Sequence, residues 1–565
     1  MKKIIFLVLI YISINGQIMG SSPNPVFGEN GMIVSTSYQA SEAGITILEK
    51  GGNAIDAAVA VGFALAVTSS GNGNLGGGGF LIASFNDGLS ISLDHREKAP
   101  SMADKDMFLN DSGNVIPGMS LYSRASSGVP GTVDGLIRIL NDYGSGEISL
   151  AEVLAPAIRL AEKGFLLSHY EAKRFNAYKE FFEHNEAAKK IFIRKDGKPW
   201  EKNNRFIQLD LAKTLKRIRK YGREGFYSGH VADLIIKEMK RGNGLISMND
   251  LSNYESKYRE PILGSYHDYE IVSMGPPSSG GALLVNMLNM LENYSLDSLE
   301  WNSSDYVHIL TEIERRAYAD RAEHMGDPDF WKVPLDMFQS KAYAKDRIKD
   351  ININQATASN LVSAGKPNGY ESSETTHYSV VDQWGNAVSV TTTINLNYGN
   401  GCIVDGAGFF LNNEMDDFSS KPGVPNVFGL IGNEANSIQP GKRPLSSMTP
   451  TIVRKNNKPF LVIGSPGGST IITTTLQTIL NVINHGMDIQ EAVCAARFHS
   501  QWLPDVIQIE PRGLAKDVID NLVLRGHKVI PYRGGYIGES NSIMITDEGI
   551  YGGGDCRGET SSLGY

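Results

Sequence analysis

Cysteine is scarce in this chain of 565 residues, which contains only Cys402, Cys494 and Cys556. Their number is odd and their spacing is wide, so they form neither a metal-binding motif nor a disulfide framework. The sequence leaves open whether two of them form one disulfide. A buried core is expected, because hydrophobic residues make up 41% and charged residues 20% of the chain, close to the average of globular proteins.

An excess of positive charge is also missing, since the formal net charge is -9 at pH 7. This balance argues against nucleic acid as a partner. Although the chain has 60 glycines, they cluster at turns and show no fixed period, so a solenoid or propeller repeat is not indicated. The length allows one large domain or two to three ordinary ones.

Long hydrophobic runs are absent from the chain after its N-terminal segment. No later stretch reaches the roughly 18 apolar residues of a membrane-spanning helix. The N-terminus has the build of a secretory signal: Lys2 and Lys3 precede an apolar run at 4–14, and residues 15–22 are small and polar. We therefore predict a signal peptide at residues 1–20 and an exported protein, periplasmic or secreted, without stable membrane insertion. An uncleaved membrane anchor is the alternative.

A threonine at the head of a predicted strand is the central feature of the sequence. Residues 375–382 and 387–393 have the composition of a β-hairpin with a Gly-Asn turn, and a polar, aperiodic stretch precedes them. If the bond between Glu374 and Thr375 were cut, the new α-amino group, with a pKa of about 7.7 to 8.0, could act as base for the Thr375 hydroxyl. Otherwise the two threonines simply begin a strand.

Two charged segments offer groups that could bind a substrate of such a nucleophile. Arg96 follows a predicted hairpin at 80–93, and its planar guanidinium is suited to a carboxylate, although an exposed arginine in a charged cluster is usually only solvated. Residues 411–418 are polar and acidic where the surrounding strands are apolar. The long Gly/Pro/Asn-containing segment 421–442 that follows is typical of a lid loop.

Two glycine-rich segments have the composition of an anion site. The N–H groups of Gly467 and Gly468, before a helix predicted at 470–484, could stabilise an oxyanion, although an ordinary strand–turn–helix junction is equally compatible. The glycines at 76–79 do not predict a nucleotide site, because no Lys-Ser/Thr pair follows them.

The remaining periodicity predicts structural elements. Helices are expected at residues 41–50 (with Ser41 as N-cap), 54–68, 149–163, 282–292 and 301–325, a hairpin at 451–464, and a mostly helical, charged cap at 165–260.

Seven short motifs occur together in one order. They are GGNAIDAA at 51–58, GGGGF at 76–80, DHRE at 94–97, TTHYS at 375–379, NNEMDDF at 412–418, PLSSM at 444–448 and GSPGG at 464–468. Each is weak alone, but in this combination the chain, from about residue 24 to its end, resembles the gamma-glutamyltransferase (gamma-glutamyl transpeptidase, glutathione hydrolase) family.

The resemblance implies an α+β fold, the four-layer αββα sandwich of N-terminal-nucleophile hydrolases. It also implies a proenzyme that cleaves itself between Glu374 and Thr375. The products would be a large subunit, residues 21–374, and a small catalytic subunit, residues 375–565, which stay associated as one compact unit. Neither a metal nor an organic cofactor is implied.

The same resemblance implies roles for individual residues. Thr375 attacks the γ-glutamyl carbonyl, Thr393 holds its hydroxyl or amine, and the N–H groups of Gly467 and Gly468 stabilise the oxyanion. The donor's α-carboxylate is expected to bind Arg96, Ser446 and Ser447, and its α-amino group Asn395, Glu414 and Asp417. The donors would be glutathione and other γ-glutamyl compounds, and the acceptors water, amino acids or dipeptides.

One departure from the family pattern and two rival functions remain. Phe428 stands in the predicted lid where many bacterial relatives have tyrosine, so a hydrogen bond across the lid is expected to be absent. The rival enzyme is a β-lactam side-chain (cephalosporin-type) acylase on the same fold, and Asp417 with its acidic run favours γ-glutamyl donors instead. A binding protein that has lost self-processing is the other rival, which the retained Thr375 and Thr393 disfavour.

Overall fold

A computed structural model describes residues 22–363, 375–421, 423–424, 426–427, 429–430 and 432–565. The predicted signal peptide at 1–20, Glu374 and Phe428 therefore lie outside the described residues. Within the described chain, no helix combines the length and the apolar character that crossing a membrane requires.

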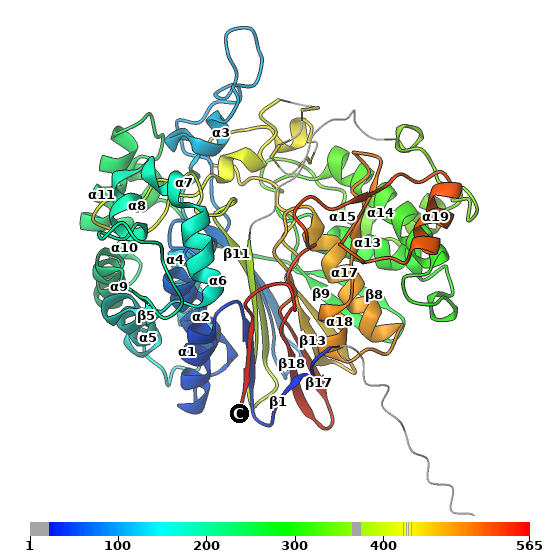
Figure 1. The fold of residues 1–565 in the computed structure, drawn as a ribbon, viewed down its shortest axis with the longest axis horizontal. Helices are drawn as coiled ribbons and strands as arrows, with labels where there is room; N and C mark the ends of the chain where they lie inside the picture. Colours follow the sequence, from blue (N-terminus) through cyan, green and yellow to red (C-terminus); the bar gives the residue numbers. More distant parts are fainter. Residues whose placement is uncertain (1–21, 364–374, 422, 425, 428, 431) are drawn as a thin grey trace, which may run out of the picture.

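In the described part of the chain, two seven-stranded antiparallel sheets lie face to face at the centre of the molecule (Figure 1). The first sheet has the order β1 (Val26–Gly28), β18 (Gly549–Gly553), β17 (Ser542–Thr546), β13 (Lys458–Ile463), β12 (Thr451–Lys455), β9 (Tyr269–Ser273), β8 (Ile262–Tyr266). The second has the order β19 (Ser561–Gly564), β2 (Met32–Ser35), β10 (Thr376–Val381), β11 (Ala387–Thr393), β3 (Gly78–Ser84), β4 (Ser90–Asp94), β7 (Lys257–Arg259).

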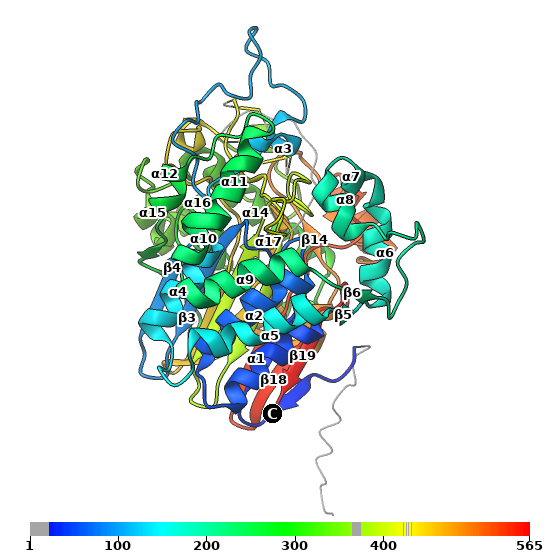
Figure 2. The ribbon, with the colours of Figure 1, turned by 90° about the vertical axis from the view of Figure 1, so that its left-hand side faces the viewer.

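Helices cover the outer face of each sheet and complete four layers. The second sheet is covered by α1 (Tyr38–Glu49), α2 (Ala54–Thr68) and α4 (Thr132–Tyr143), with α5 (Leu150–Lys163) and α9 (Leu209–Tyr221) packed further out (Figure 2). The first sheet is covered by α13 (Gly280–Leu291), α17 (Thr470–Ile483) and α18 (Ile489–Cys494), with α14 (Ser304–His324) behind them. The predicted αββα sandwich is confirmed.

Three buried clusters correspond to the three spaces between the layers. One lies between the second sheet and its helices, one between the first sheet and its helices, and a smaller one, which includes Val34, Ile82 and Val462, between the two sheets. Helix α2 is buried along its whole length, because it lies between the sheet and α5. This explains why its sequence is apolar all round.

The other described strands and α-helices lie at the periphery or in connections. They are β5 (Phe165–Leu166), β6 (Arg205–Phe206), β14 (Phe498–His499), β15 (Ile507–Ile509), β16 (Val529–Pro531), α3 (Met119–Tyr122), α6 (His169–Ala177), α7 (Lys179–Glu183), α8 (Glu186–Phe192), α10 (Glu224–Tyr227), α11 (Gly229–Lys240), α12 (Met248–Ser252), α15 (Leu335–Gln339), α16 (Lys341–Arg347) and α19 (Lys516–Leu524).

The predicted helix at 41–50 was placed too late in the chain. Helix α1 begins at Tyr38, and its N-cap is Ser37, whose side chain accepts a hydrogen bond from the Ala40 N–H. Ser41 lies inside the helix and bonds Ser35 across 2.8 Å instead. A serine just before an apolar repeat is an N-cap signal, and Ser37, four residues before Ser41, carries the same signal.

Other predicted boundaries fit more closely. Helix α2 has the predicted bounds, α5 starts directly after its N-cap Ser149, and α14 starts three residues later than predicted, after its N-cap Ser303. The predicted hairpin at 451–464 turns through Asn456 and Asn457, whose φ angles are 52° and 62°. Asparagine tolerates this left-handed conformation.

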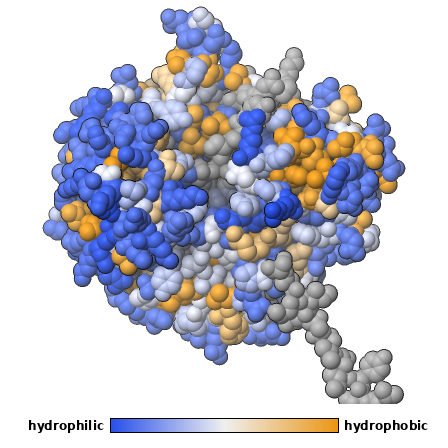
Figure 3. All heavy atoms as spheres, in the orientation of Figure 1, coloured by the Kyte–Doolittle hydropathy of each residue, from blue (hydrophilic) through white to orange (hydrophobic). Residues whose placement is uncertain are grey.

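The region 165–260 is mostly helical, as predicted, and its surface over α6–α11 is predominantly hydrophilic (Figure 3). It is more than a cap, however, because β7 extends the central sheet by pairing with β4. Cys494 and Cys556 form a disulfide, which settles the question that the sequence left open, and Cys402 is a buried free thiol.

Candidate active site

Thr375 lies directly before β10, in the row of β10 residues that faces the other sheet. In this hairpin Tyr378 and Val380 pack against the helices, whereas His377 and Ser379 point between the sheets. Because Thr376 pairs with Thr392, the register places Thr375 across from Thr393 at the open end of the hairpin. The alternation of the strand therefore directs Thr375 toward the space between the sheets.

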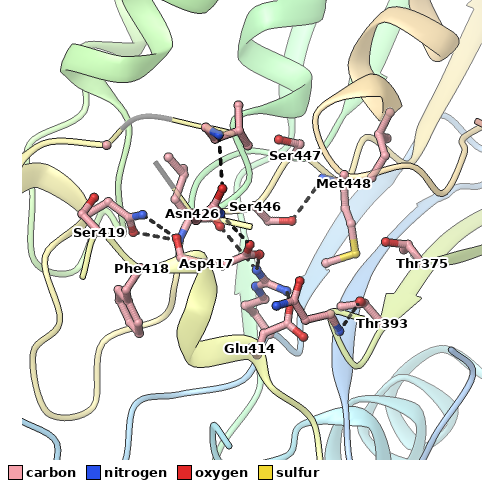
Figure 4. Close-up of a pocket in the computed structure, with 18 of the residues that line it drawn as sticks. Thr375, Thr393, Glu414, Asp417, Phe418, Ser419, Asn426, Ser446, Ser447 and Met448 are labelled. Carbon is pink, nitrogen blue, oxygen red and sulfur yellow. Dashed lines mark hydrogen bonds and ion pairs between the residues drawn. The ribbon is translucent and has the colours of Figure 1, made fainter. Parts of the chain in front are cut away.

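One cavity at this end of the sandwich brings most of the predicted site residues together (Figure 4). Its lining includes Arg96, Thr375, Thr393, Asn395, Glu414, Asp417, Ser446, Ser447 and Gly468. Thr393 belongs to β11 of the second sheet, and the others come from segments outside the two sheets that are far apart in the sequence. Gly467 does not line the cavity; its carbonyl accepts hydrogen bonds from the N–H and the hydroxyl of Thr470 at the start of α17.

Thr375 is held by its backbone and is 7% exposed. Its carbonyl accepts a hydrogen bond of 3.2 Å from the Asn72 amide, and the neighbouring Thr376 hydroxyl lies 3.0 Å from that of Thr36. The Thr393 hydroxyl accepts a bond of 2.8 Å from the Asn395 N–H. These contacts fix the backbone on both sides of the hairpin opening.

Arg96 is the centre of a buried ion cluster. It is 1% exposed and forms ion pairs with Glu414 and Asp417, while Glu97 lies 3.7 Å away. Burial alone would lower the pKa of this guanidinium, but the three carboxylates outweigh burial and raise it. The solvated arginine that the sequence allowed is thus excluded, and the cluster carries more carboxyl groups than cations.

The carboxyl groups of this cluster are themselves perturbed. Burial raises the pKa of Glu97 to about 7, against the opposing effect of Arg96. Burial also raises the pKa of Glu414 and of Asp417. A cation placed beside these groups would restore their charged forms, so the cluster is suited to a ligand ammonium group.

Glu414 and Asp417 are positioned by a short 3-10 helix, η4 (Glu414–Asp417). The preceding Asn412 anchors it, since its amide donates to the carbonyls of Gly76 and Gly128 across 2.7 and 2.8 Å. A Cβ on Gly76 would lie 2.0 Å from the Phe410 carbonyl. The glycines of this run therefore allow close approach of the backbone, which supports the position of the acidic residues.

The segment predicted as a lid lies against the cavity. Of its described residues, Asn426, Leu430, Gly432 and Asn436 line the cavity. The amide of Asn426 donates to Asp417 across 3.2 Å, and that of Asn436 donates to the Asp417 carbonyl across 2.7 Å.

Arg321 is a cavity residue that no sequence motif indicated. It lies on α14 and donates hydrogen bonds to the hydroxyls of Ser279 (2.8 Å) and Ser447 (3.1 Å). In the sequence it is one of many charges in a long predicted helix. Nearly every residue of α14 is buried, including the charged ones. Only the folded structure shows that Arg321 lines the cavity.

His377, next to the predicted nucleophile, does not line the cavity. Its ring bonds the hydroxyls of Thr391 (2.9 Å) and Ser379 (3.1 Å) between the sheets. Burial lowers its pKa to about 3, so the imidazole is neutral at pH 7. It is a packing residue of the hairpin.

The αββα sandwich is the fold of the N-terminal-nucleophile hydrolases, and in this chain Thr375 lies at the opening of the central hairpin. The model of the gamma-glutamyltranspeptidase family matches residues 40–565. The chain belongs to the gamma-glutamyltranspeptidase family.

Relatives and solved structures agree with this assignment. The chain is 47% identical over 536 residues to the glutathione hydrolase proenzyme of Escherichia coli (strain K12), covering 94% of this chain and 91% of the relative. It is 36% identical over 539 residues to the acylase ACY 1 proenzyme of Pseudomonas sp. (strain SE83), covering 94% and 93%. The crystal structure of cephalosporin acylase from Bacillus halodurans superposes with a TM-score of 0.83 at 26% identity, covering 98% and 99%.

Proposed function

We propose that this protein is an exported gamma-glutamyltransferase and glutathione hydrolase that cleaves itself between Glu374 and Thr375. The observation that carries the proposal is the lining of the cavity beside Thr375. It combines an acidic cluster, Glu414 and Asp417, with hydroxyl and guanidinium donors at Ser446, Ser447 and Arg321. A γ-glutamyl head group bears both an ammonium and a carboxylate, so it requires both kinds of partner.

The reaction begins with the freed α-amino group of Thr375, which takes the proton of the Thr375 hydroxyl. The hydroxyl oxygen attacks the γ-glutamyl carbonyl, and the N–H groups of Gly467 and Gly468 stabilise the negative charge on the carbonyl oxygen. The amine leaves with a proton, and a γ-glutamyl ester remains on Thr375. Water then releases glutamate, or the amine of an amino acid or dipeptide takes the γ-glutamyl group.

The donor is oriented by its two charged groups. Asn395, Glu414 and Asp417 bind the α-amino group, and Arg96, Ser446 and Ser447 bind the α-carboxylate. Thr393 lies across the hairpin opening and holds the hydroxyl or amine of Thr375. Burial of the ion cluster strengthens these interactions, because the surroundings screen charge less than water does.

The large subunit, residues 21–374, and the small subunit, residues 375–565, stay together after cleavage. Strand β10 pairs with β2 and β11 pairs with β3, so the second sheet contains strands from both sides of the cut. The first sheet does so too, since β12 pairs with β9. Separation would break two sheets.

Mass spectrometry of the exported protein and of a Thr375→Ala variant tests the proposal. The wild type is expected to give two fragments, the smaller starting at Thr375, and to release amine from γ-glutamyl anilides, whereas the variant stays intact and inactive. A single uncut wild-type chain that still turns over γ-glutamyl donors would contradict the proposed nucleophile. An uncut, inactive wild type would favour the binding protein.

The second candidate is a cephalosporin-type acylase, which the similarity to the acylase relative and to the acylase structure favours. A glutaryl donor lacks the α-amino group that Asp417 would bind. Comparison of glutaryl with γ-glutamyl anilide decides between the two functions: we expect the γ-glutamyl donor to react faster, and faster glutaryl turnover would reverse the assignment.

A further inference from the structure

Positive charge is concentrated in one part of a chain that is acidic as a whole. Residues 189–223 contain 13 lysines and arginines but only 3 acidic residues, whereas the formal net charge of the chain is -9. The segment includes β6 and α9, on the side of the molecule that faces the viewer in Figure 2. Because charges more than about 8 Å apart are screened at physiological salt, a ligand that approaches this side meets mainly the local positive charge.

Helix α9 lies along the surface with one face buried and the other exposed. Its buried residues recur at the spacing of an amphipathic helix: Leu211, Ala212, Thr214, Leu215 and Ile218. Its five basic residues are exposed or half-buried: Lys213, Lys216, Arg217, Arg219 and Lys220. At 1.5 Å per residue, the 13 residues of the helix form a basic ridge about 20 Å long.

The end of α5 and strand β6 extend this basic surface. Arg205 donates hydrogen bonds to the carbonyl groups of Lys163 (3.2 Å) and Gly164 (3.0 Å). Lys216 bonds Glu162 and, with smaller contributions from Lys163 and Arg219, lowers the pKa of that carboxyl. We call the combined surface the α9 face. Its seven cations are Lys163, Arg205, Lys213, Lys216, Arg217, Arg219 and Lys220, and its two carboxylates are Glu162 and Asp210.

Three large apolar side chains are exposed among these cations. Leu209 is 58%, Tyr221 49% and Ile207 44% exposed. Arg217 and Lys220 lie 5.6 and 4.8 Å from the centre of the Tyr221 ring. Cations around exposed apolar and aromatic side chains are typical of a membrane interface, where the long basic side chains reach the headgroups and the apolar ones enter the acyl boundary. A polyanion in water would gain nothing from the two aliphatic side chains.

We propose that the α9 face is a docking surface for a membrane whose outer leaflet carries anionic lipid headgroups. Lys213 and Lys216 have carboxylate partners in Asp210 (2.8 Å) and Glu162, but no ion pair in the described chain involves the other five cations of the face. Lipid phosphates supply their counter-ions. The contact is peripheral, because α9 remains packed on α5 through its apolar side. None of these residues lines the cavity beside Thr375, so docking does not depend on the catalytic assignment.

The expected strength of docking follows from the charge of the face. A lysine or arginine near an anionic leaflet strengthens binding about fivefold, which corresponds to about 1 kcal/mol. Since the cations of the α9 face exceed its carboxylates by five, anionic vesicles are expected to bind up to roughly 1,000-fold more tightly than neutral ones. Such docking is reversible and weakens with salt.

Sedimentation with vesicles tests the proposal on the processed, full-length mature protein. Vesicles with about 30% phosphatidylglycerol in phosphatidylcholine should bind the protein, and vesicles of phosphatidylcholine alone should bind it at least about tenfold more weakly. Binding should fall as NaCl rises from about 50 to about 300 mM. No binding to the anionic vesicles, or equal binding to both kinds, would overturn the inference.

Two triple variants separate the α9 face from net charge. The test variant combines Lys213→Gln, Lys216→Gln and Lys220→Gln. The control variant combines Lys345→Gln, Lys349→Gln and Lys516→Gln, on the far side of the sandwich around α16 and α19. In each set two of the three lysines are in ion pairs. The test variant should bind anionic vesicles about 100-fold more weakly and the control within about twofold of wild type. Equal losses would reduce the effect to net charge and overturn the inference.

Leu209→Ser distinguishes a membrane from a soluble polyanion. It should weaken binding to the anionic vesicles about three- to tenfold, because less apolar surface leaves water, and leave binding to heparin unchanged. Tighter binding of heparin or duplex DNA than of vesicles would make the face a polyanion site and overturn the inference. Tm and turnover of γ-glutamyl anilide should match wild type in all three variants, which separates a loss of docking from unfolding and from a failure of the proposed function.

Discussion

Two buried clusters of charged and titratable side chains can be compared in this molecule. One surrounds Arg96 at the cavity beside Thr375. The other joins His308, Glu312 and His527, whose ligand atoms lie within 4.8 Å of one another and resemble a metal site in composition. Both are buried, and both contain carboxylates and basic groups, but they differ in whether their charges are balanced.

In the second cluster, Glu312 and both histidines already have hydrogen-bonding partners within the protein. Glu312 accepts hydrogen bonds from Arg315, from Arg316 and from the Thr357 N–H. The ring nitrogens of His308 and His527 approach each other to 2.7 Å. Arg315 and Arg316 also pair with Asp505 and Asp350, each across 3.0 Å, so the charges of this cluster are balanced within the protein.

In the cavity, the charges of the protein are unbalanced at both ends. Carboxyl groups outnumber cations at the Arg96 end, and a cation lacks a carboxylate at the Arg321 end. The difference teaches that burial of charge does not itself mark a site. A site is indicated where a cavity meets charges that only a ligand would balance.

The largest effect is expected from breaking the balanced cluster. Glu312→Gln leaves Arg315 and Arg316 without their buried counter-ion, so the free energy of unfolding should fall by about 3–5 kcal/mol. Chemical denaturation measures this loss. The kcat/KM per folded molecule should stay within about twofold, and a donor-selective loss would mean that the cluster is part of the site.

Removing one charge from the unbalanced cluster should instead change donor selection. For Asp417→Asn we expect kcat/KM for γ-glutamyl anilide to fall by about 100-fold, because the α-amino group loses its charged partner. Glutaryl anilide lacks that amine and should lose less than about fivefold. Equal losses for both donors would show that Asp417 acts only by holding Arg96.

The balanced cluster should also contribute to acid sensitivity. Burial, together with His308 and Arg315, lowers the pKa of His527 to about 3 from its usual 6.5. Between these values the unfolded chain binds a proton that the folded chain does not, so stability is full above pH 6.5 and falls as the pH drops. His527→Gln should reduce the slope of unfolding free energy against pH by about 1.4 kcal/mol per unit.

Urea titrations between about pH 6 and pH 4 measure that slope for the wild type and the variant. His377, whose pKa burial also lowers to about 3, keeps its contribution in both proteins. Parallel slopes would mean that His527 is already protonated in the folded protein.

The smallest effect concerns the lid over the unbalanced cluster. Phe428→Tyr adds the hydroxyl that many bacterial relatives carry, and one neutral hydrogen bond is worth about 0.5–1.5 kcal/mol. We expect the KM for γ-glutamyl donors to change by about 2- to 10-fold. Steady-state kinetics check this, and unchanged kcat and KM would argue against a gate at this position.

Much of the fold was accessible from the sequence because its signals are local. The apolar run of α2, the Asn456-Asn457 turn and the Ser149 N-cap each depend on residues a few positions apart. The start of α1 was missed because Ser41 carries an N-cap signal of its own, whereas the helix is capped by Ser37 and continues through Ser41. The family resemblance added the αββα architecture, which strand and helix patterns would not have produced.

The sequence by itself determined the position of Thr375 at a strand head, the acidic run at 412–418 and the set of residues to be brought together. Only the tertiary structure decided that Arg96 is bound by that acidic run, that Arg321 faces the same cavity, and that His377 does not. The hydrophobic pattern of the sequence indicates which side of a strand or helix a residue occupies. The balance of charge at a site depends on which distant segments meet there, and that is fixed only when the layers pack.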